Sequence, residues 1–339
     1  MKAAVMYGQY DIRIEERAKP VPLEGEAVIK VKTAGICGSD IHFYDGSHPY
    51  KNYPRVYGHE LAGIIDEISG NNKGLKKGDK VVIEPLIPCG RCYPCRIGKY
   101  NCCANAKMTG VHVDGGFAEY ILVPINNIYK IPDSMPFNTA CLCEPYSIGA
   151  QIVVIRAEVK RDDKVVILGS GAIGLCALDF IKNIGARVLI TDIQPFRLEM
   201  AKLFGADVVI NSKEENINDC VMNFTDSEGA SVVIEATGVA KIMENTENLV
   251  AAGGRIVIAG LTNDKVAFTG INFTKKEMTI LGSRNSMNMF PYVVDMMSSG
   301  KLNAKKLITH KFTFDKIMEA FEFISKNPGK IGKVIIEMG

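Results

Sequence analysis

The sequence feature that most constrains the fold is a run of glycines between an apolar strand pattern and an apolar helix pattern. Gly169, Gly171 and Gly174 have G-x-G-x-x-G spacing within KVVILGSGAIGLCALDFIKNIGARVLITD, which ends at Asp192, 18 residues beyond the last glycine. This order predicts a strand, a tight turn, a helix whose N-terminus receives a diphosphate, and a second strand. The segment therefore predicts an α/β domain that binds a dinucleotide.

The acidic residue at the end of the second strand indicates which dinucleotide is bound. A carboxylate there hydrogen-bonds the hydroxyls of the adenosine ribose and repels a 2′-phosphate, so Asp192 favours NAD over NADP. The residues that we expect to contact the cofactor are Gly169, Gly171, Ile173, Gly174, Asp192 and Arg197.

Strand and helix patterns continue to alternate after this segment, as they do in a doubly wound parallel sheet. We place this domain at 151–284, and its six strands include four expected at 207–210, 231–235, 254–260 and 277–282. Residues 285–339 are too few to fold alone, so we expect them to return to the first domain. They show helix patterns near 289–299 and 314–325 and a strand pattern at 333–338.

The first part of the chain has a different texture, in which glycines separate short apolar runs. This texture predicts a mostly β domain at 1–150. Its expected strands are 2–7, 26–33, 57–69, 78–85 and 117–124. One long helix is expected at 138–159, in spite of Pro145.

A lobe of cysteines at 89–103 predicts a metal site. Cys89, Cys92, Cys95 and Cys103 have C-x2-C-x2-C-x7-C spacing, and four thiolates this close complete a tetrahedral shell without an open position. That composition indicates a structural zinc. An iron–sulfur centre uses similar ligands, but a chain with a nicotinamide-type fold favours zinc. Cys102 directly precedes Cys103, and we expect its thiol to turn away from the metal.

A second metal site is indicated by three residues of different ligand type, Cys37, His59 and Glu60. A thiolate, an imidazole and a carboxylate can bind zinc and leave its fourth position open for chemistry. Ser39 and His42 follow the cysteine closely enough for one loop to present a hydroxyl and an imidazole for proton transfer. Taken singly, such residues are more often core or surface residues than ligands. The other motifs of the chain strengthen the metal hypothesis.

Glu144 lies among apolar residues inside the expected helix. A carboxylate in that setting needs a partner. The local sequence leaves two explanations open, a role at the metal or a structural cap or ion pair.

Composition and charge exclude several classes of protein. With 339 residues the chain is long enough for about two domains. Its 40 basic and 38 acidic residues are interspersed, so nothing indicates a surface for nucleic acid. The sequence contains no run of about 18 apolar residues, the length that could span a membrane, and its N-terminus lacks a signal-peptide pattern. We therefore expect a cytoplasmic protein whose ten cysteines serve metal binding rather than disulfides.

With both metal motifs and the glycine motif in place, the chain resembles the zinc-dependent medium-chain dehydrogenases over nearly its full length. GHE at 58–60 together with CEPYSIGA at 143–150 is similar to the sorbitol (L-iditol) dehydrogenase branch, whereas simple alcohol dehydrogenases have a cysteine at the position of Glu144. PRVYGHE, GVHVDGGFAEY and KKEMTILGSRN are similar to bacterial dehydrogenases of hexonates such as L-galactonate and, less closely, to galactitol-phosphate dehydrogenases. The resemblance implies a GroES-like, mostly β catalytic domain and a Rossmann domain, with a substrate cleft between them.

The resemblance also implies roles for individual residues. The catalytic zinc would be bound by Cys37, His59 and Glu60, with Glu144 as a ligand or as a partner near the metal. Ser39 and His42 would relay the proton. Residues near the substrate would be Phe43, Glu144, Arg284 and Asn285. Phe43 stands where sorbitol dehydrogenases often have a tyrosine, which weakens the case for sorbitol, and Arg284 is equally well explained as a surface or hinge residue.

These expectations combine into one function with several alternatives. We expect NAD-dependent oxidation of a secondary alcohol of a polyol or sugar acid to the ketone, with one catalytic and one structural zinc per chain. A sugar-alcohol phosphate is an alternative substrate. A zinc-free quinone reductase would lack the metal ligands, and a non-catalytic nucleotide-binding protein would need no proton relay. Analogy with the family implies a homodimer or homotetramer.

Overall fold

The computed structural model describes residues 1–339, which form two compact units. The first unit contains Met1–Glu144, Phe290–Ser299 and Ile308–Gly339, and the second contains Pro145–Met289 and Gly300–Leu307. The chain therefore passes between the units four times. Residues 145–150, 285–289 and 300–307, which we expected from the sequence to lie outside the nucleotide-binding domain, belong to the second unit in this division.

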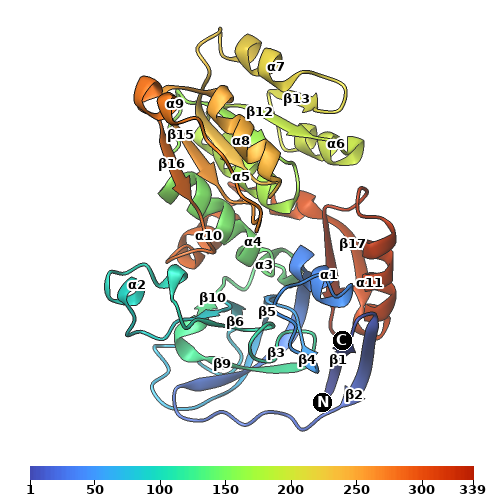
Figure 1. The fold of residues 1–339 in the computed structure, drawn as a ribbon. Coiled ribbons are helices and arrows are strands. Elements are labelled where there is room, and N and C mark those ends of the chain that lie inside the picture. The colour runs from blue at the N-terminus through green and yellow to red at the C-terminus, as the bar shows by residue number, and fades with distance from the viewer. The chain divides into compact units, whose positions relative to one another are not determined.

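The first unit is built on β-sheets, as its glycine-separated apolar runs predicted (Figure 1). A seven-stranded sheet has the order β10-β6-β5-β3-β18-β17, with β9 also paired to β3, and a smaller sheet has the order β2-β1-β4. The strands are β1 Lys2–Gly8, β2 Asp11–Glu16, β3 Glu26–Ile36, β4 Arg55–Val56, β5 Glu60–Ile68, β6 Lys80–Ile83, β7 Leu86–Ile87, β8 Lys107–Met108, β9 Tyr120–Pro124, β10 Ile128–Lys130, β17 Ile308–Thr313 and β18 Lys333–Glu337. The helices are α1 Gly38–Tyr44, α2 Tyr93–Arg96, α3 Phe137–Ala140, α10 Phe290–Ser298 and α11 Ile317–Lys326.

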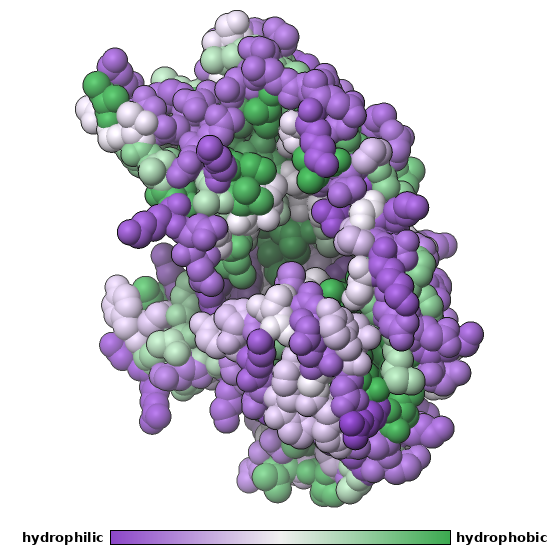
Figure 2. Space-filling view, turned by 45° about the vertical axis from the view of Figure 1, so that its right-hand side comes forward, coloured by the Kyte–Doolittle hydropathy of each residue, from purple (hydrophilic) through white to green (hydrophobic).

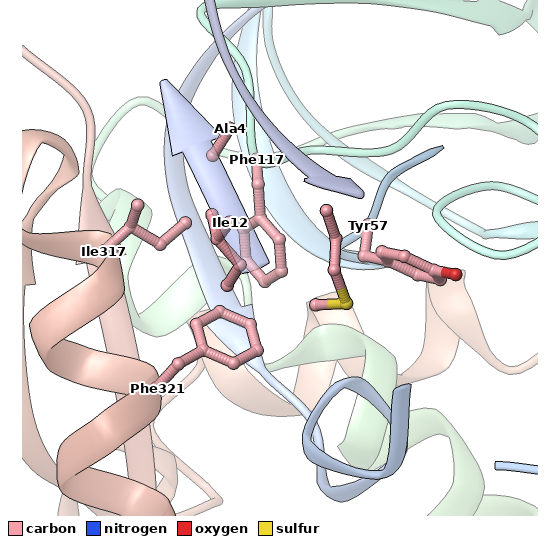
Figure 3. A pocket seen from close by; sticks show the side chains of 7 residues that line it. Ala4, Ile12, Tyr57, Phe117, Ile317 and Phe321 are labelled. Carbon is pink, nitrogen blue, oxygen red and sulfur yellow. The ribbon is translucent and has the colours of Figure 1, made fainter. Parts of the chain in front are cut away.

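The C-terminal segment completes the core of this unit. β18 pairs antiparallel with β3, so that Val334 lies opposite Ile36, and α11 buries an apolar face that includes Ile317 and Phe321. Figure 3 shows these two side chains directed toward Ile12 and Phe117 around a small apolar cavity. Because hydrophobic burial is the main driving force of folding, the C-terminal strand and helix are needed to complete the core of the first unit.

The second unit contains one sheet of six parallel strands in the order β13-β12-β11-β14-β15-β16, with helices packed along it (Figure 1). Its strands are β11 Lys164–Leu168, β12 Arg187–Asp192, β13 Val208–Asn211, β14 Ala230–Glu235, β15 Val250–Ile258 and β16 Thr279–Gly282. Its helices are α5 Ala172–Ile184, α6 Pro195–Leu203, α7 Ile217–Phe224, α8 Ala240–Leu249 and α9 Gly270–Lys276. The strand order reverses direction between β11 and β14, and such a switch point is where open α/β sheets bind ligands. The doubly wound sheet expected from the sequence is confirmed.

The single long helix expected at 138–159 is wrong. The structure has α3, then a break at residues 141–142, then α4 (Cys143–Ala150), which continues as a π-helical segment over Gln151–Arg156. A proline inside a continuous helix would remove a backbone hydrogen bond and clash with the preceding turn. Restarting the helix at Cys143 places Pro145 in the first turn, where its missing N–H costs nothing.

On the face shown in Figure 2, hydrophilic residues dominate the outer surface, and hydrophobic residues occur mostly in small groups among them. None of the helices is both long enough and apolar enough to cross a membrane.

Candidate active site

Two neighbouring strands bring Cys37 and Glu60 together. β3 ends at Ile36, Cys37 is the N-cap of α1, and Gly35 of β3 lies opposite Glu60 at the start of β5. The approach is so close that a Cβ on Gly35 would lie 2.2 Å from Oε2 of Glu60. Glycine at position 35 therefore leaves the space that the glutamate carboxylate occupies.

Cys37, His59 and Glu60 form a cluster whose potential ligand atoms all lie within 4.8 Å of one another. His59 and Glu60 are buried, and Oε2 of Glu60 has no hydrogen-bond partner. Burial lowers the pKa of His59, but the Cys37 thiolate and the Asp40 carboxylate outweigh it and raise that pKa well above its usual value. A buried Glu60 oxygen without a partner and the excess of negative charge around it both fit a site for a cation such as zinc.

Two residues that the sequence did not reveal complete this cluster. Nζ of Lys333, the first residue of β18, donates a hydrogen bond of 2.6 Å to Oε1 of Glu60, and both residues are buried. Oδ1 of the buried Asp40 lies 3.8 Å from Nδ1 of His59, while its Oδ2 accepts the Cys37 N–H. A carboxylate behind a metal-binding histidine orients the ring. No local motif identifies Lys333, because it lies 273 positions from Glu60. Asp40 follows Cys37 by three residues, but only the fold places it against His59.

Glu144 is the second residue of α4 and is 7% exposed. Burial raises the pKa of its carboxyl to about 7, the charge of Glu60 adds to this, and His59 opposes it. Glu144 thus interacts electrostatically with the cluster without belonging to the three residues whose ligand atoms lie within 4.8 Å. This placement fits a partner near the metal better than a permanent ligand.

Of the other residues expected near the metal and the substrate, Ser39 and His42 lie on the same short helix, and Phe43 lies in the core. Ser39 and His42 both lie on α1, but no hydrogen bond joins them: His42 is exposed and its Nδ1 is 2.9 Å from Oγ of Ser47. The Phe43 ring is fully buried and stacks on Tyr57, with ring centroids 4.4 Å apart. Its burial leaves no surface for a substrate, so Phe43 is a core residue in this structure.

The four cysteines of the lobe also converge. Their sulfur atoms lie within 4.8 Å of one another, and Sγ of Cys92 is 3.4 Å from that of Cys95 and 3.7 Å from that of Cys103. Backbone N–H groups of Arg91 and Cys92 lower the pKa of Cys89 to about 6, which favours the thiolate that binds metal. Cys102 is exposed and stands outside the group.

A buried carboxylate fastens the lobe to the sheet of the first unit. Oε1 of Glu84 accepts a hydrogen bond of 2.9 Å from the Tyr100 hydroxyl in the lobe, and Oε2 accepts one of 2.7 Å from Tyr129 on β10. Since Tyr129 also stacks on Phe290, the base of the lobe is held by both polar and aromatic contacts.

Each glycine of the nucleotide motif has its own structural reason. Gly169 has a φ of +99°, a left-handed conformation that favours glycine, and a Cβ on Gly174 would lie 2.0 Å from the Gly169 carbonyl oxygen. Gly171 is the N-cap of α5, and a Cβ there would meet nothing within 4 Å. Gly169 and Gly174 therefore serve the close packing of strand and helix, while Gly171 leaves open the helix N-terminus where a diphosphate binds.

The carboxylate of Asp192 ends β12 beside this turn. Oδ2 accepts hydrogen bonds from N and Oγ of Ser170, at 2.9 and 3.1 Å, and Oδ1 accepts the N–H groups of Ile193 and Gln194. Nη1 of Arg197 lies 3.9 Å from Oδ2 of Asp192. The carboxylate of Asp192 thus also holds the backbone of the glycine turn in place.

Three further residues of this unit were expected near the cofactor or the substrate. Ile173 is half-buried on α5, Arg284 is exposed, and Asn285 has a φ of +45°.

Comparison with known proteins decides the family. Residues 23–133 match the alcohol dehydrogenase GroES-like domain, and residues 172–299 match the zinc-binding dehydrogenase domain. The chain is a zinc-type alcohol dehydrogenase. The starvation-sensing protein RspB of Escherichia coli is 35% identical, with 99% of each chain covered, and a crystal structure of an E. coli RspB with NADH superimposes with a TM-score of 0.93 over 99% of each chain.

Two other relatives are named for their substrates. The L-galactonate-5-dehydrogenase of E. coli is 37% identical over 309 residues, covering 91% of this chain and 90% of the relative. The L-threonine 3-dehydrogenase of Pyrococcus horikoshii is 39% identical over 334 residues, covering 96% and 95%. The expectations of a medium-chain dehydrogenase, of zinc and of NAD are therefore confirmed, and the zinc-free and non-catalytic alternatives are not supported.

We predict that Cys92→Ser in this dehydrogenase reduces bound zinc from two ions to one and lowers the melting temperature, because structural zinc contributes directly to folding. Metal analysis and thermal unfolding measure both effects. Cys102→Ser is the matched control and should change neither. Two zinc ions and an unchanged melting temperature in Cys92→Ser would show that the lobe does not hold zinc.

We further predict that Lys333→Met lowers the free energy of unfolding by about 3–5 kcal/mol, because it leaves the Glu60 carboxylate buried without its cation. Lys311→Met is the control, since the half-exposed Lys311 on β17 pairs with Glu337 on β18, and its loss should cost less than about 1 kcal/mol. Denaturant titration compares the two. Equal losses would contradict a special role for Lys333.

Proposed function

We propose that this dehydrogenase oxidises a secondary alcohol of a polyol or sugar acid to the ketone, with NAD⁺ as hydride acceptor and zinc bound by Cys37, His59 and Glu60. The observation that carries the proposal is the buried cluster of these three residues, with an unpartnered Glu60 oxygen. Three ligands of these types leave one zinc position for the substrate hydroxyl.

The substrate class is supported by sequence similarity. The stretches GHE and CEPYSIGA resemble the sorbitol dehydrogenase branch, and one relative is named an L-galactonate-5-dehydrogenase. L-threonine is a second candidate, because a relative with 39% identity is named an L-threonine 3-dehydrogenase. Both named relatives act on a carbon that bears a secondary hydroxyl in a molecule that also carries a carboxylate. A carboxylated secondary alcohol is therefore the first substrate type to test.

Zinc, when bound, supplies a Lewis acid that lowers the pKa of the reacting hydroxyl. Lys333 pairs with Glu60 and so reduces the negative charge around the bound cation. Asp40 keeps the His59 ring oriented from behind.

The proton that leaves the substrate needs a route to solvent. We assign it to Ser39 and His42, which share one short helix that begins at Cys37. Nδ1 of His42 is engaged by Ser47, so Nε2 is the atom available to accept the proton, and its exposed ring can release it to water. In the second unit, Gly171 receives the diphosphate and Asp192 the adenosine ribose. Arg284 and Asn285 are proposed to contact the substrate, and the enzyme is proposed to be a homodimer or homotetramer.

A spectrophotometric screen of NAD⁺ reduction tests the proposal. Substrates are hexitols, hexonates including L-galactonate, hexitol phosphates and L-threonine, each assayed with the parent enzyme and with Cys37→Ala. The proposal expects one carboxylated or polyhydroxylated secondary alcohol to be oxidised by the parent enzyme and not by the variant. Turnover confined to primary alcohols, or equal turnover by Cys37→Ala, would overturn it.

We predict that Asp192→Ala weakens NADH binding at least tenfold and raises the use of NADP⁺ relative to NAD⁺, because the variant loses the ribose hydrogen bonds and the repulsion of a 2′-phosphate. Since the carboxylate also fixes Ser170, NADPH affinity should not exceed the parent's affinity for NADH. Fluorescence titration measures both coenzymes. Asn211→Ala, at the paired position of β13, is the control. A parent enzyme that already prefers NADP⁺ would refute this prediction.

A further inference from the structure

A buried tyrosine and a buried aspartate join two helices of the second unit. The hydroxyl of Tyr146, on α4, donates a hydrogen bond of 2.8 Å to Oδ2 of Asp179, on α5. Tyr146 is fully buried and Asp179 is 1% exposed. Neither residue contacts the predicted zinc ligands or belongs to the nucleotide motif, so the proposed chemistry leaves this pair without a role.

The Asp179 carboxylate is fixed from a second side. Asn303 donates its backbone N–H to Oδ2 at 2.6 Å and its Nδ2 to Oδ1 at 3.0 Å. A buried carboxylate is costly, and apolar residues of similar size would pack as well with less desolvation. The polar arrangement instead fixes a position: three directed hydrogen bonds to the Asp179 carboxylate determine where the Tyr146 hydroxyl lies.

Tyr146 stands two residues after Glu144 in the first turn of the same helix. Residues two apart on an α-helix project about 200° from each other, so the tyrosine holds one side of the turn while the glutamate is directed to the other. Glu144 is buried and interacts electrostatically with His59 and Glu60. A displacement of this turn therefore moves the Glu144 carboxylate relative to the predicted metal ligands.

The second turn of α4 is anchored separately. Oγ of Ser147 donates to Oγ of Ser286 at 2.8 Å, and Oε1 of Gln151 accepts the Met287 N–H at 3.2 Å. The helix would therefore stay in place without the Tyr146 hydroxyl, and only its first turn would be released. This makes the removal of that hydroxyl a mild and local change.

We propose that Tyr146 and Asp179 are positioning residues that set the place of the Glu144 carboxylate beside the catalytic zinc. The inference rests on the proposed function of the Cys37, His59 and Glu60 cluster. α5, which holds Asp179, begins at the diphosphate-binding glycine turn, so the helix that receives the cofactor also fixes the turn that carries Glu144.

The test is a double-mutant cycle of Tyr146→Phe and Glu144→Gln in the zinc-loaded enzyme, with the best substrate of the screen. Tyr146→Phe should lower kcat about 10-fold, as changes around a metal site do, and leave KM for NAD⁺ unchanged. In the Glu144→Gln background the same change should lower kcat less than about 2-fold, because the residue that the tyrosine positions is already altered.

Tyr129→Phe is the matched control, since it removes another buried tyrosine hydroxyl from a carboxylate, Glu84, at 2.7 Å. It should lower the melting temperature about as much as Tyr146→Phe but leave kcat within about 2-fold of the parent value. Equal losses of kcat from Tyr146→Phe with and without Glu144 would mean a purely structural role and would overturn the proposal.

A spectroscopic measurement separates this inference from the proposed function. In protein whose catalytic zinc is replaced by cobalt(II), Tyr146→Phe and Glu144→Gln should both shift the visible absorption bands of the metal, and Tyr129→Phe should not. An unchanged spectrum in Tyr146→Phe would overturn the positioning role. Since this readout needs no turnover, it decides the question even when no alcohol in the screen is oxidised.

Discussion

The burial of negative charge in one place is the constraint on which the first unit depends. The thiolate and carboxylate groups concerned belong to Cys37, Asp40, Glu60 and Glu144. Only one buried lysine, Lys333, faces them. Since a buried charge without compensation costs several kcal/mol, this arrangement favours the binding of further positive charge, which the proposed zinc would supply. On the proposed function, the metal would be part of the charge balance of the fold as well as of the chemistry.

The same ion pair ties the chain's end to its beginning. Lys333 opens β18, which pairs with β3, and β3 leads directly to Cys37. The site is complete only after the last strand has joined a sheet made by the first part of the chain. Such a contact between distant segments closes a long loop and forms late in folding as a rule. The proposed metal site therefore depends on a finished first unit.

The features that the sequence predicted correctly are those decided by near neighbours. The cysteine lobe, the glycine turn and the six parallel strands follow from residue spacing and local periodicity, and the structure has them all. Most of the features that it missed depend on distant contacts. Lys333 looks like an ordinary strand residue until β18 is placed, and Phe43 cannot be assigned to core or substrate before the stacking of Tyr57 is known. The helix break before Cys143 was missed because apolar periodicity outweighed the proline signal.

The central claim is that zinc binds at Cys37, His59 and Glu60 while Lys333 holds the other oxygen of Glu60. Diffraction from crystals of the native protein at energies above and below the zinc absorption edge tests it most directly. We expect one anomalous peak among the four lobe cysteines and a second in contact with Cys37, His59 and Oε2 of Glu60, with Lys333 still bound to Oε1. A second peak bound by Glu144 in place of Glu60, or no peak beside Cys37, would contradict the claim.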